Sequence, residues 1–296
     1  MKFENIRVMN FEGALRGMRN PKNSWHLSDS KFDISDGSHM ADAADEVASS
    51  WLEFLNKDSD DELRDEIADW LVSEGDIDGG NICDCYQYAF IGPRDMKLAQ
   101  QLISGGSEHR KFLRQIQVSV DITAPLYWWK EFDTYKVGTT ANSTSTMHKI
   151  TSKPITLDCF EMDDYEEYCS FLPDFLGEEG LTADDCESLI IRFIDFLEGL
   201  RKKYLETKNY KYWKELIRWL PESWLQTRTV TMNYENLLSM YHQRRFHKLD
   251  EWSGTTEEGV LTPTFIKFIE GLPYAKHFLM FLEIYNCNEF PLIDFS

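Results

Sequence analysis

The chain has 296 residues, enough for one large domain or two ordinary ones, and its apolar fraction of 42% can fill a hydrophobic core. It contains no run of about eighteen apolar residues, which excludes an ordinary transmembrane helix. The stretch from Met1 to Gly13 lacks the apolar segment and cleavage site of a secretory signal. We therefore expect a cytoplasmic protein with no membrane partner.

The net charge of −20 argues against a nucleic-acid polymer as partner, because two polyanions repel each other. A small anionic ligand in a local basic pocket remains compatible with this charge. The six cysteines are scattered, and the one close pair, Cys83 and Cys85, lacks the two-residue gap typical of zinc or redox pairs. We expect reduced cysteines and no metal site.

The first eighty residues predict a strand, a short helix and an acidic hairpin. Lys2 to Met9 has the pattern of a strand, and Phe11 to Met18 that of a helix. The polar turn 19–23 is either an ordinary loop or a ligand contact. Two amphipathic helices are predicted at about 41–56 and 60–74, with a solvated acidic face. Asp58 to Glu62 lacks the spacing of a calcium loop and is read as a turn before a helix.

The middle of the chain alternates helix and strand. A helix is predicted from Pro93 to Ile103, ended by Gly105-Gly106, and is followed by the basic cluster His109 to Arg114. Gln115 to Ile122 alternates in polarity as a half-buried strand does, and an aromatic helix follows Pro125. The short polar side chains of 136–146 suit either an oxyanion site or a simple loop.

The region 157–209 is predicted to be helical, with an apolar stripe that we assign to the core: Leu189, Ile190, Phe193, Phe196 and Leu197. Another short helix is expected at 210–219. The last helical stretch covers about 263–285 and is interrupted near Gly271 to Pro273. On it, His277 is expected to be a core residue with its hydrogen bonds satisfied.

The stretch 220–252 carries the most information. Gln226 to Met232 alternates like a strand, and Asn233 is a good N-cap for the helix that follows. On that helix Arg244 shares a face with Leu237, Tyr241 and Lys248, so its guanidinium should be buried and needs an anion. That anion is either a protein carboxylate or a ligand phosphate. Arg245, His247 and Lys248 add positive charge.

No phosphate loop, dinucleotide fingerprint, zinc-protease motif or nucleophile elbow occurs in the chain. Two separated blocks nevertheless form a pattern. The first has these residues: Leu220-Pro221, Thr227, Met232-Asn233, Leu237-Leu238, Arg244, His247 and Trp252. The second has these: Gly105-Gly106, His109, Gln115 to Ile122, and Ala124-Pro125. In chain order the second block, the loop to Ser145 and the first block, mainly 95–150 and 214–252, resemble the flavin-dependent thymidylate synthase family.

The resemblance implies an α/β (α+β) fold with a small mixed sheet flanked by many helices. The family-like core would comprise 1–30, 93–156 and 210–296. The acidic segment 31–92 and the segment 157–209 would be added helical insertions. It also implies a homotetramer whose sites are shared between subunits.

The resemblance further implies methylation of a pyrimidine deoxynucleotide such as dUMP with a reduced flavin. FAD, NADPH and methylene-tetrahydrofolate are the implied cofactors. Arg244 would be catalytic and bind the nucleotide, together with Arg218, Ser143, Thr144 and Ser145. The implied cofactor-binding residues are His109, Lys130, Tyr135, Lys136, Asn142 and His247.

The chain departs from the family at its hallmark, which is Arg-His-Arg, then seven residues, then serine. Before Ser145 this chain has Tyr135-Lys136-Val137, and a shift by one gives Thr134-Tyr135-Lys136 before Thr144. A substrate-binding arginine of the family is replaced by Ile217, next to Arg218. Two alternatives therefore stay open: a non-catalytic nucleotide-binding or regulatory protein with the same fold, and an acidic protein-interaction module.

Overall fold

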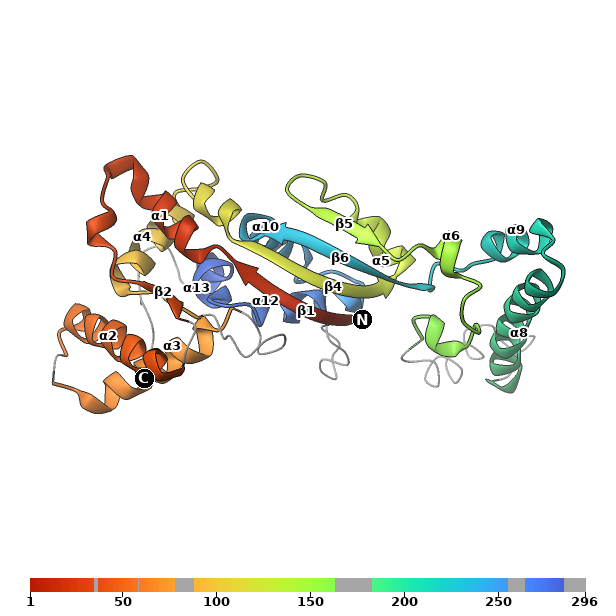
Figure 1. Cartoon of the computed structure of the whole chain (residues 1–296), viewed down its shortest axis with the longest axis horizontal. Helices are drawn as coiled ribbons and strands as arrows, with labels where there is room; N and C mark the ends of the chain where they lie inside the picture. The colour runs from red at the N-terminus through yellow and green to blue at the C-terminus, as the bar shows by residue number, and fades with distance from the viewer. Residues whose placement is uncertain (35–36, 58, 78–87, 163–182, 255–263, 285–296) are drawn as a thin grey trace. The chain divides into compact units, whose positions relative to one another are not determined.

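The computed structural model describes residues 1–34, 37–57, 59–77, 88–162, 183–254 and 264–284 (Figure 1). The chain divides into two compact units. Unit 1 comprises Met1, Ile122–Thr134 and Asn142–Arg228. Unit 2 comprises Lys2–Asp121, Tyr135–Ala141 and Thr229–Ser296. Each unit is described by itself. Among the described helices, none is both long and apolar enough to cross a bilayer.

Four strands form the main sheet in the order β1 (Lys2–Met9), β4 (Gln117–Pro125), β6 (Leu225–Asn233) and β5 (Thr140–Ser143). Figure 1 shows β1, β4 and β6 side by side although they are far apart in the sequence. Every second residue of β4 is buried, as the alternation of its sequence predicts. A second sheet pairs β2 (Lys31–Ile34) antiparallel with β3 (Tyr88–Phe90).

The core of unit 2 is aromatic. Phe11 packs edge-on against Tyr234 and Tyr274, with ring centroids 5.7 and 5.8 Å apart. Phe11 and Tyr234 begin two helices, and Tyr274 directly precedes a third.

Apart from the acidic hairpin, the described helices of unit 2 are α1 (Phe11–Arg19), α4 (Pro93–Ser104), α10 (Tyr234–Arg244), α11 (Asp250–Ser253), α12 (Phe265–Glu270), α13 (Ala275–Phe278) and α14 (Phe281–Ile284). The unit also has short 3-10 turns, η1 (Asn20–Lys22), η2 (Trp25–Leu27) and η3 (Lys111–Gln115).

The predicted acidic hairpin is confirmed as α2 (Gly37–Leu55) and α3 (Asp61–Gly75). Asp60 caps α3 by accepting a hydrogen bond from the Leu63 amide, so this acidic turn is a helix start. No group of three metal-ligating side chains occurs among the described residues. Trp51 and Trp70 join the hairpin to the rest of unit 2, because Trp51 donates to the Ile91 carbonyl and Trp70 packs on Tyr274. The division of the chain into a core and two insertions stays a prediction.

The prediction for His277 is half right. The residue is buried, and its ring packs edge-on against Trp70 with centroids 5.4 Å apart. Within the described part of the chain, however, its Nδ1 has no hydrogen-bond partner. Burial, with a smaller effect of Lys276, lowers the pKa of His277 to about 4. The buried imidazole beside Trp70 is therefore neutral near pH 7.

The described residues of unit 1 form five helical segments: α5 (Leu126–Phe132), α6 (Thr146–Lys149), η4 (Leu157–Cys159), α8 (Ala183–Thr207) and α9 (Tyr210–Arg218). Its apolar cluster centres on Ile150, Ile155, Phe160, Leu197 and Leu216. Cys159 is a free thiol, as expected. Cys83, Cys85, Cys169 and Cys287 lie outside the described residues.

The apolar stripe predicted on α8 is only partly core. Leu197 is fully buried, but Leu189 is 58% exposed and Phe196 is 45% exposed. Helical periodicity predicts which side chains share a face, not whether another element covers that face. Phe196 instead packs edge-on against Trp219 of unit 1, which is itself exposed.

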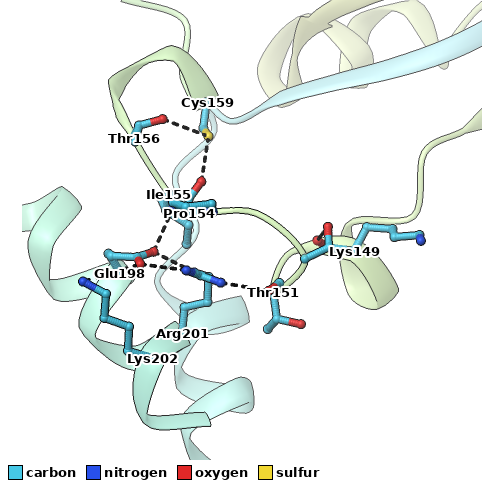
Figure 2. Close-up of polar contacts among 10 residues, drawn as sticks. Lys149, Thr151, Pro154, Ile155, Thr156, Cys159, Glu198, Arg201 and Lys202 are labelled. Carbon is cyan, nitrogen blue, oxygen red and sulfur yellow. Dashed lines mark hydrogen bonds and ion pairs between the residues drawn. The ribbon is translucent and has the colours of Figure 1, made fainter. Parts of the chain in front are cut away.

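A charged network fastens the loop before η4 to α8 (Figure 2). The Arg201 guanidinium donates to both carboxylate oxygens of Glu198, at 2.7 and 2.8 Å, and to the Thr151 carbonyl at 3.0 Å. Glu198 also accepts from the Ile155 amide at 2.9 Å. The hydrogen bond from Arg201 lowers the pKa of Glu198. The pair therefore holds two backbone groups of one loop from a single helix.

We predict that Arg201→Met lowers the free energy of unfolding by about 1–3 kcal/mol, because a buried charged hydrogen-bond donor is lost. Since the folded-state pKa of Glu198 lies below its ordinary value of 4.5, this stabilisation is present above pH 4.5 and fades as the pH falls further. Urea unfolding followed by circular dichroism at several pH values measures both effects. Lys203→Met, which breaks an exposed pair with Glu206 on the same helix, is the control and should change little. Equal effects of the two variants would contradict the prediction.

A second prediction concerns His277. The unfolded chain binds a proton on this histidine below its ordinary pKa of 6.5, whereas the folded chain binds it only near pH 4. The free energy of unfolding should therefore fall between pH 6.5 and 4, by roughly 3 kcal/mol from this group. His277→Leu should flatten that part of the stability profile, and His26→Leu at the exposed turn η2 should leave it unchanged. A proton NMR titration that placed the pKa of His277 above 6 would refute the prediction.

Candidate functional site

Arg244 lies at the end of α10, half-buried beside two aromatic side chains of unit 2. Its Nε donates to the Tyr135 hydroxyl at 2.8 Å. Its guanidinium carbon lies 5.5 Å from the centroid of the Tyr135 ring and 4.9 Å from that of the Trp252 ring. Cation–π contacts orient a guanidinium without neutralising it. The phenol hydroxyl and the two rings therefore fix the orientation of this guanidinium.

The start of α10 explains how Tyr135 reaches Arg244. Asn233 caps the helix as predicted, and Asn236 completes the capping box with it. The Asn236 amide also donates to the Val137 carbonyl at 2.8 Å. Gly138 has φ of +79°, and a Cβ at this position would come within 3.0 Å of both asparagine side chains. The loop that carries Tyr135 is thus fastened to the cap.

Two further predicted site residues belong to this part of unit 2. His247 Nδ1 accepts from the Leu249 amide at 3.1 Å, and its ring packs edge-on against Trp252 with centroids 6.1 Å apart. The acceptor role of Nδ1 assigns the proton to Nε2. Lys136 follows Tyr135 and is exposed. The structure therefore brings Arg244, Tyr135 and His247 around Trp252.

The predicted helical face is wrong at one residue. Leu237 and Tyr241 are buried and Arg244 is half-buried, but α10 ends at Arg244, so Lys248 lies beyond it and is exposed. Burial, with the nearby Arg245 and Arg110, lowers the pKa of His242. This histidine therefore adds no positive charge at the end of α10 near neutral pH.

His109 contributes to a cavity of about 710 Å³ in unit 2. Its ring lies against Gly105, where a Cβ would come within 3.2 Å of it. Lys22 and Lys111 place positive charge on the rim, so the turn 19–23 joins the basic cluster predicted at 109–114. The apolar lining residues are Met18, Leu98, Leu102 and Phe112. The cavity combines an apolar lining with a charged edge, at which Lys111 is paired with Glu108 at 3.2 Å.

The predicted hydroxyl loop lies in unit 1, against β6. The Thr144 amide donates to the Thr227 carbonyl at 2.8 Å. Ser145 caps α6: its Oγ accepts from the His148 amide at 3.2 Å and lies 2.7 Å from His148 Nδ1. Ser143 and Asn142 are exposed at the end of β5. The loop thus presents hydroxyl groups in a defined position, which a flexible linker would not do.

Two other predicted residues of unit 1 form ion pairs on its surface. Lys130 is bound to Glu222 at 2.6 Å, and Arg218 is bound to Glu215. The side chains of both cations are more than half exposed. Their described contacts are with these carboxylates and not with the hydroxyl loop, so their predicted roles rest on the sequence resemblance alone.

Sequence reasoning missed Gln226 and Arg228 on β6. Gln226 Nε2 donates to the Thr144 carbonyl and to Thr146 Oγ1, both at 3.1 Å. Arg228 Nε donates to Gln226 Oε1 at 2.9 Å, and its guanidinium carbon lies 4.2 Å from the centroid of the Trp129 ring. The available signal was the strand alternation, which places residues 226 and 228 on one face.

No protein-family model matches the sequence, and no curated protein matches it. Solved structures do match. A superposition on thymidylate synthase X from Helicobacter pylori with FAD and dUMP covers 94% of this chain and 97% of that chain, with a TM-score of 0.50 and 13% identity. A second structure, the flavin-dependent thymidylate synthase of the same organism complexed with FAD and dUMP, is 13% identical to this chain. That superposition covers 80% of this chain and 92% of that chain, with a TM-score of 0.42. The first likeness confirms the expected fold class, a small sheet flanked by many helices.

We predict that Tyr135→Phe loosens Arg244 without unfolding unit 2, because the ring remains and the hydroxyl, which accepts from Arg244 and donates to Gln243, is lost. Hydrogen exchange at Arg244 Nε, measured by NMR, should become about five-fold faster, which corresponds to one ordinary hydrogen bond. Tyr210→Phe, which alters a tyrosine stacked on Trp213 in unit 1, is the control and should leave this exchange unchanged. An unchanged rate in Tyr135→Phe would show that the phenol does not hold the guanidinium.

Proposed function

We propose that this protein is a divergent flavin-dependent thymidylate synthase-like enzyme that methylates a pyrimidine deoxynucleotide such as dUMP. The observation that carries the proposal is the orientation of Arg244, whose guanidinium is held by Tyr135 and Trp252 on a chain with this fold. An arginine in such a setting suits an anionic or carbonyl-bearing ligand, because its planar fork donates two parallel hydrogen bonds.

Each group of residues has a distinct role in the proposal. Arg244 binds the nucleotide and polarises its base, and His247 supports the aromatic floor under it. The hydroxyls of Ser143, Thr144 and Ser145 donate hydrogen bonds to the phosphate, and Arg218 is the cation that the resemblance assigns to it. Lys130, Lys136 and Asn142 are assigned to the cofactor from the resemblance. Arg244 binds charge that develops on the base during the reaction, which is where a fixed cation accelerates a step.

The cavity beside His109 fits the cofactor that the fold implies. Its volume of about 710 Å³ lies in the range of cofactor sites, its lining suits a flat ring system, and Lys22 and Lys111 suit a pyrophosphate. FAD would supply the hydride chemistry, which no side chain can replace. NADPH and methylene-tetrahydrofolate are the co-substrates that catalysis requires in this proposal. We further propose a cytoplasmic homotetramer in which each site takes residues from more than one subunit.

A non-catalytic nucleotide-binding or regulatory protein is the second candidate. The observation that favours it is the replacement of the Arg-His-Arg hallmark by Thr134-Tyr135-Lys136 or Tyr135-Lys136-Val137. Arg218, the cation beside Ile217, is moreover bound to Glu215 on the surface of unit 1. An acidic interaction module, using the exposed face of α2 and α3, is the third candidate. It rests on charge alone.

We predict that the purified protein takes up FAD, with absorbance near the flavin bands, and that dUMP raises its melting temperature. Arg244→Ala should weaken dUMP binding at least ten-fold in calorimetry, because a desolvated charged contact is lost. Arg245→Ala, the adjacent arginine that packs on Phe246, is the matched control and should bind as the wild type does. Stabilisation by dUMP without flavin uptake would favour the non-catalytic candidate. If neither ligand binds, the nucleotide proposal is wrong.

A further inference from the structure

To bind a phosphate, the hydroxyl loop of unit 1 needs a positively charged side chain held in a fixed position, and the loop itself does not supply one. A phosphate monoester carries close to two negative charges, which hydroxyl groups alone compensate poorly. In the loop, His148 Nδ1 is engaged with Ser145, and His148 and Lys149 are both exposed. A long exposed lysine loses much side-chain entropy when it binds. A pre-oriented arginine does not carry that cost.

Arg228 is such an arginine, and it comes from the neighbouring strand. Stacking on Trp129 fixes the plane of its guanidinium, and the Trp129 indole is itself fixed because its Nε1 donates to the Gln226 carbonyl at 2.9 Å. The side chain of Arg228 is 16% exposed, so one edge still reaches solvent. It is therefore both rigid and accessible.

Gln226 connects this guanidinium to the hydroxyl loop. Its side-chain oxygen accepts from Arg228 Nε, while its side-chain nitrogen donates to the loop at Thr144 and Thr146. One amide group thus contacts both components. Loss of this amide would free the loop and the guanidinium together, so Gln226 sets the distance between the hydroxyls and the charge.

Asp133 occupies the outer edge of the guanidinium. Its Oδ1 accepts from Arg228 Nη1 at 2.7 Å, and its side chain is 52% exposed. An exposed carboxylate gains little net free energy from such a pair, because water competes for both charges. A phosphate oxygen carries more negative charge and presents several acceptors, so it can displace Asp133 from the same donors.

We propose that Arg228 is the phosphate-binding arginine of the hydroxyl loop, with Gln226 as its positioning residue and Asp133 as an exchangeable stand-in for the phosphate. The inference rests on the proposed function, and it names a residue that takes the 5′-phosphate of the nucleotide. It assigns the charge to β6 and not to Arg218, whose described partner is Glu215.

The test is calorimetric titration of the full-length protein with dUMP and with deoxyuridine, which lacks the phosphate. Arg228→Met should weaken dUMP binding at least ten-fold and leave deoxyuridine binding unchanged. Asp133→Asn, which removes the competing charge without removing bulk, should tighten dUMP binding several-fold. Arg192→Gln, an exposed arginine of α8 in the same unit, is the charge-matched control and should alter neither ligand.

Three outcomes would overturn the inference. The first is equal dUMP affinity of Arg228→Met and wild type. The second is a ten-fold loss in Arg218→Gln with none in Arg228→Met, which would assign the phosphate to Arg218. The third is weaker dUMP binding in Asp133→Asn, a variant that also covers the case in which Arg228→Met fails to fold. In all three the wild type still binds dUMP, so they differ from failure of the proposed function, in which the wild type binds neither ligand.

Discussion

The capping box at the start of α10 determines the geometry of the Arg244 cluster. The side chains of Asn233 and Asn236 each accept a hydrogen bond from the backbone N–H of the other residue. The side-chain NH₂ group of Asn236 also donates to the Val137 carbonyl. Gly138 permits this approach, because any side chain there would collide with the two asparagines. The cap therefore fixes both where the helix begins and where Tyr135 lies. Arg244, three turns further along the same helix, meets Tyr135 because both are placed by one local structure.

Local patterns in the sequence predicted the parts that depend on near neighbours. The alternation of residues 115–122, the cap at Asn233 and the acidic hairpin all follow from spacing and propensity, and each is present. Spacing failed where the outcome depends on a remote partner. It extended α10 to Lys248, since periodicity does not reveal where a helix stops, and it placed Leu189 in a core that the described residues do not provide.

The candidate site shows the same division. Arg244 was recognised because a charged residue interrupts an apolar face, which is visible in the sequence. Arg228 was not recognised, because an arginine on a strand is unremarkable until Trp129 is known to lie under it. The hydroxyl loop was recognised only as a composition. Its position depends on Gln226, whose two hydrogen bonds to the loop join segments eighty residues apart.

Arg244 and Arg228 share one feature, because each guanidinium lies over a tryptophan ring. In a chain with a net charge of −20, carboxylates are abundant, and an arginine that pairs fully with one is electrically neutral toward a ligand. Arg244 and Arg228 both lie on tryptophan faces, which orient the guanidinium, and Asp133, the carboxylate that pairs with Arg228, has a half-exposed side chain. The buried pair of Arg19 and Asp95, at 2.5 Å, shows the opposite arrangement, in which a fully buried carboxylate neutralises the guanidinium inside the fold. Aromatic support therefore separates the arginines available to an anion from those that serve stability. By this criterion, loss of the Arg-His-Arg hallmark need not mean loss of anion binding, because the cation can come from the strand beside the loop.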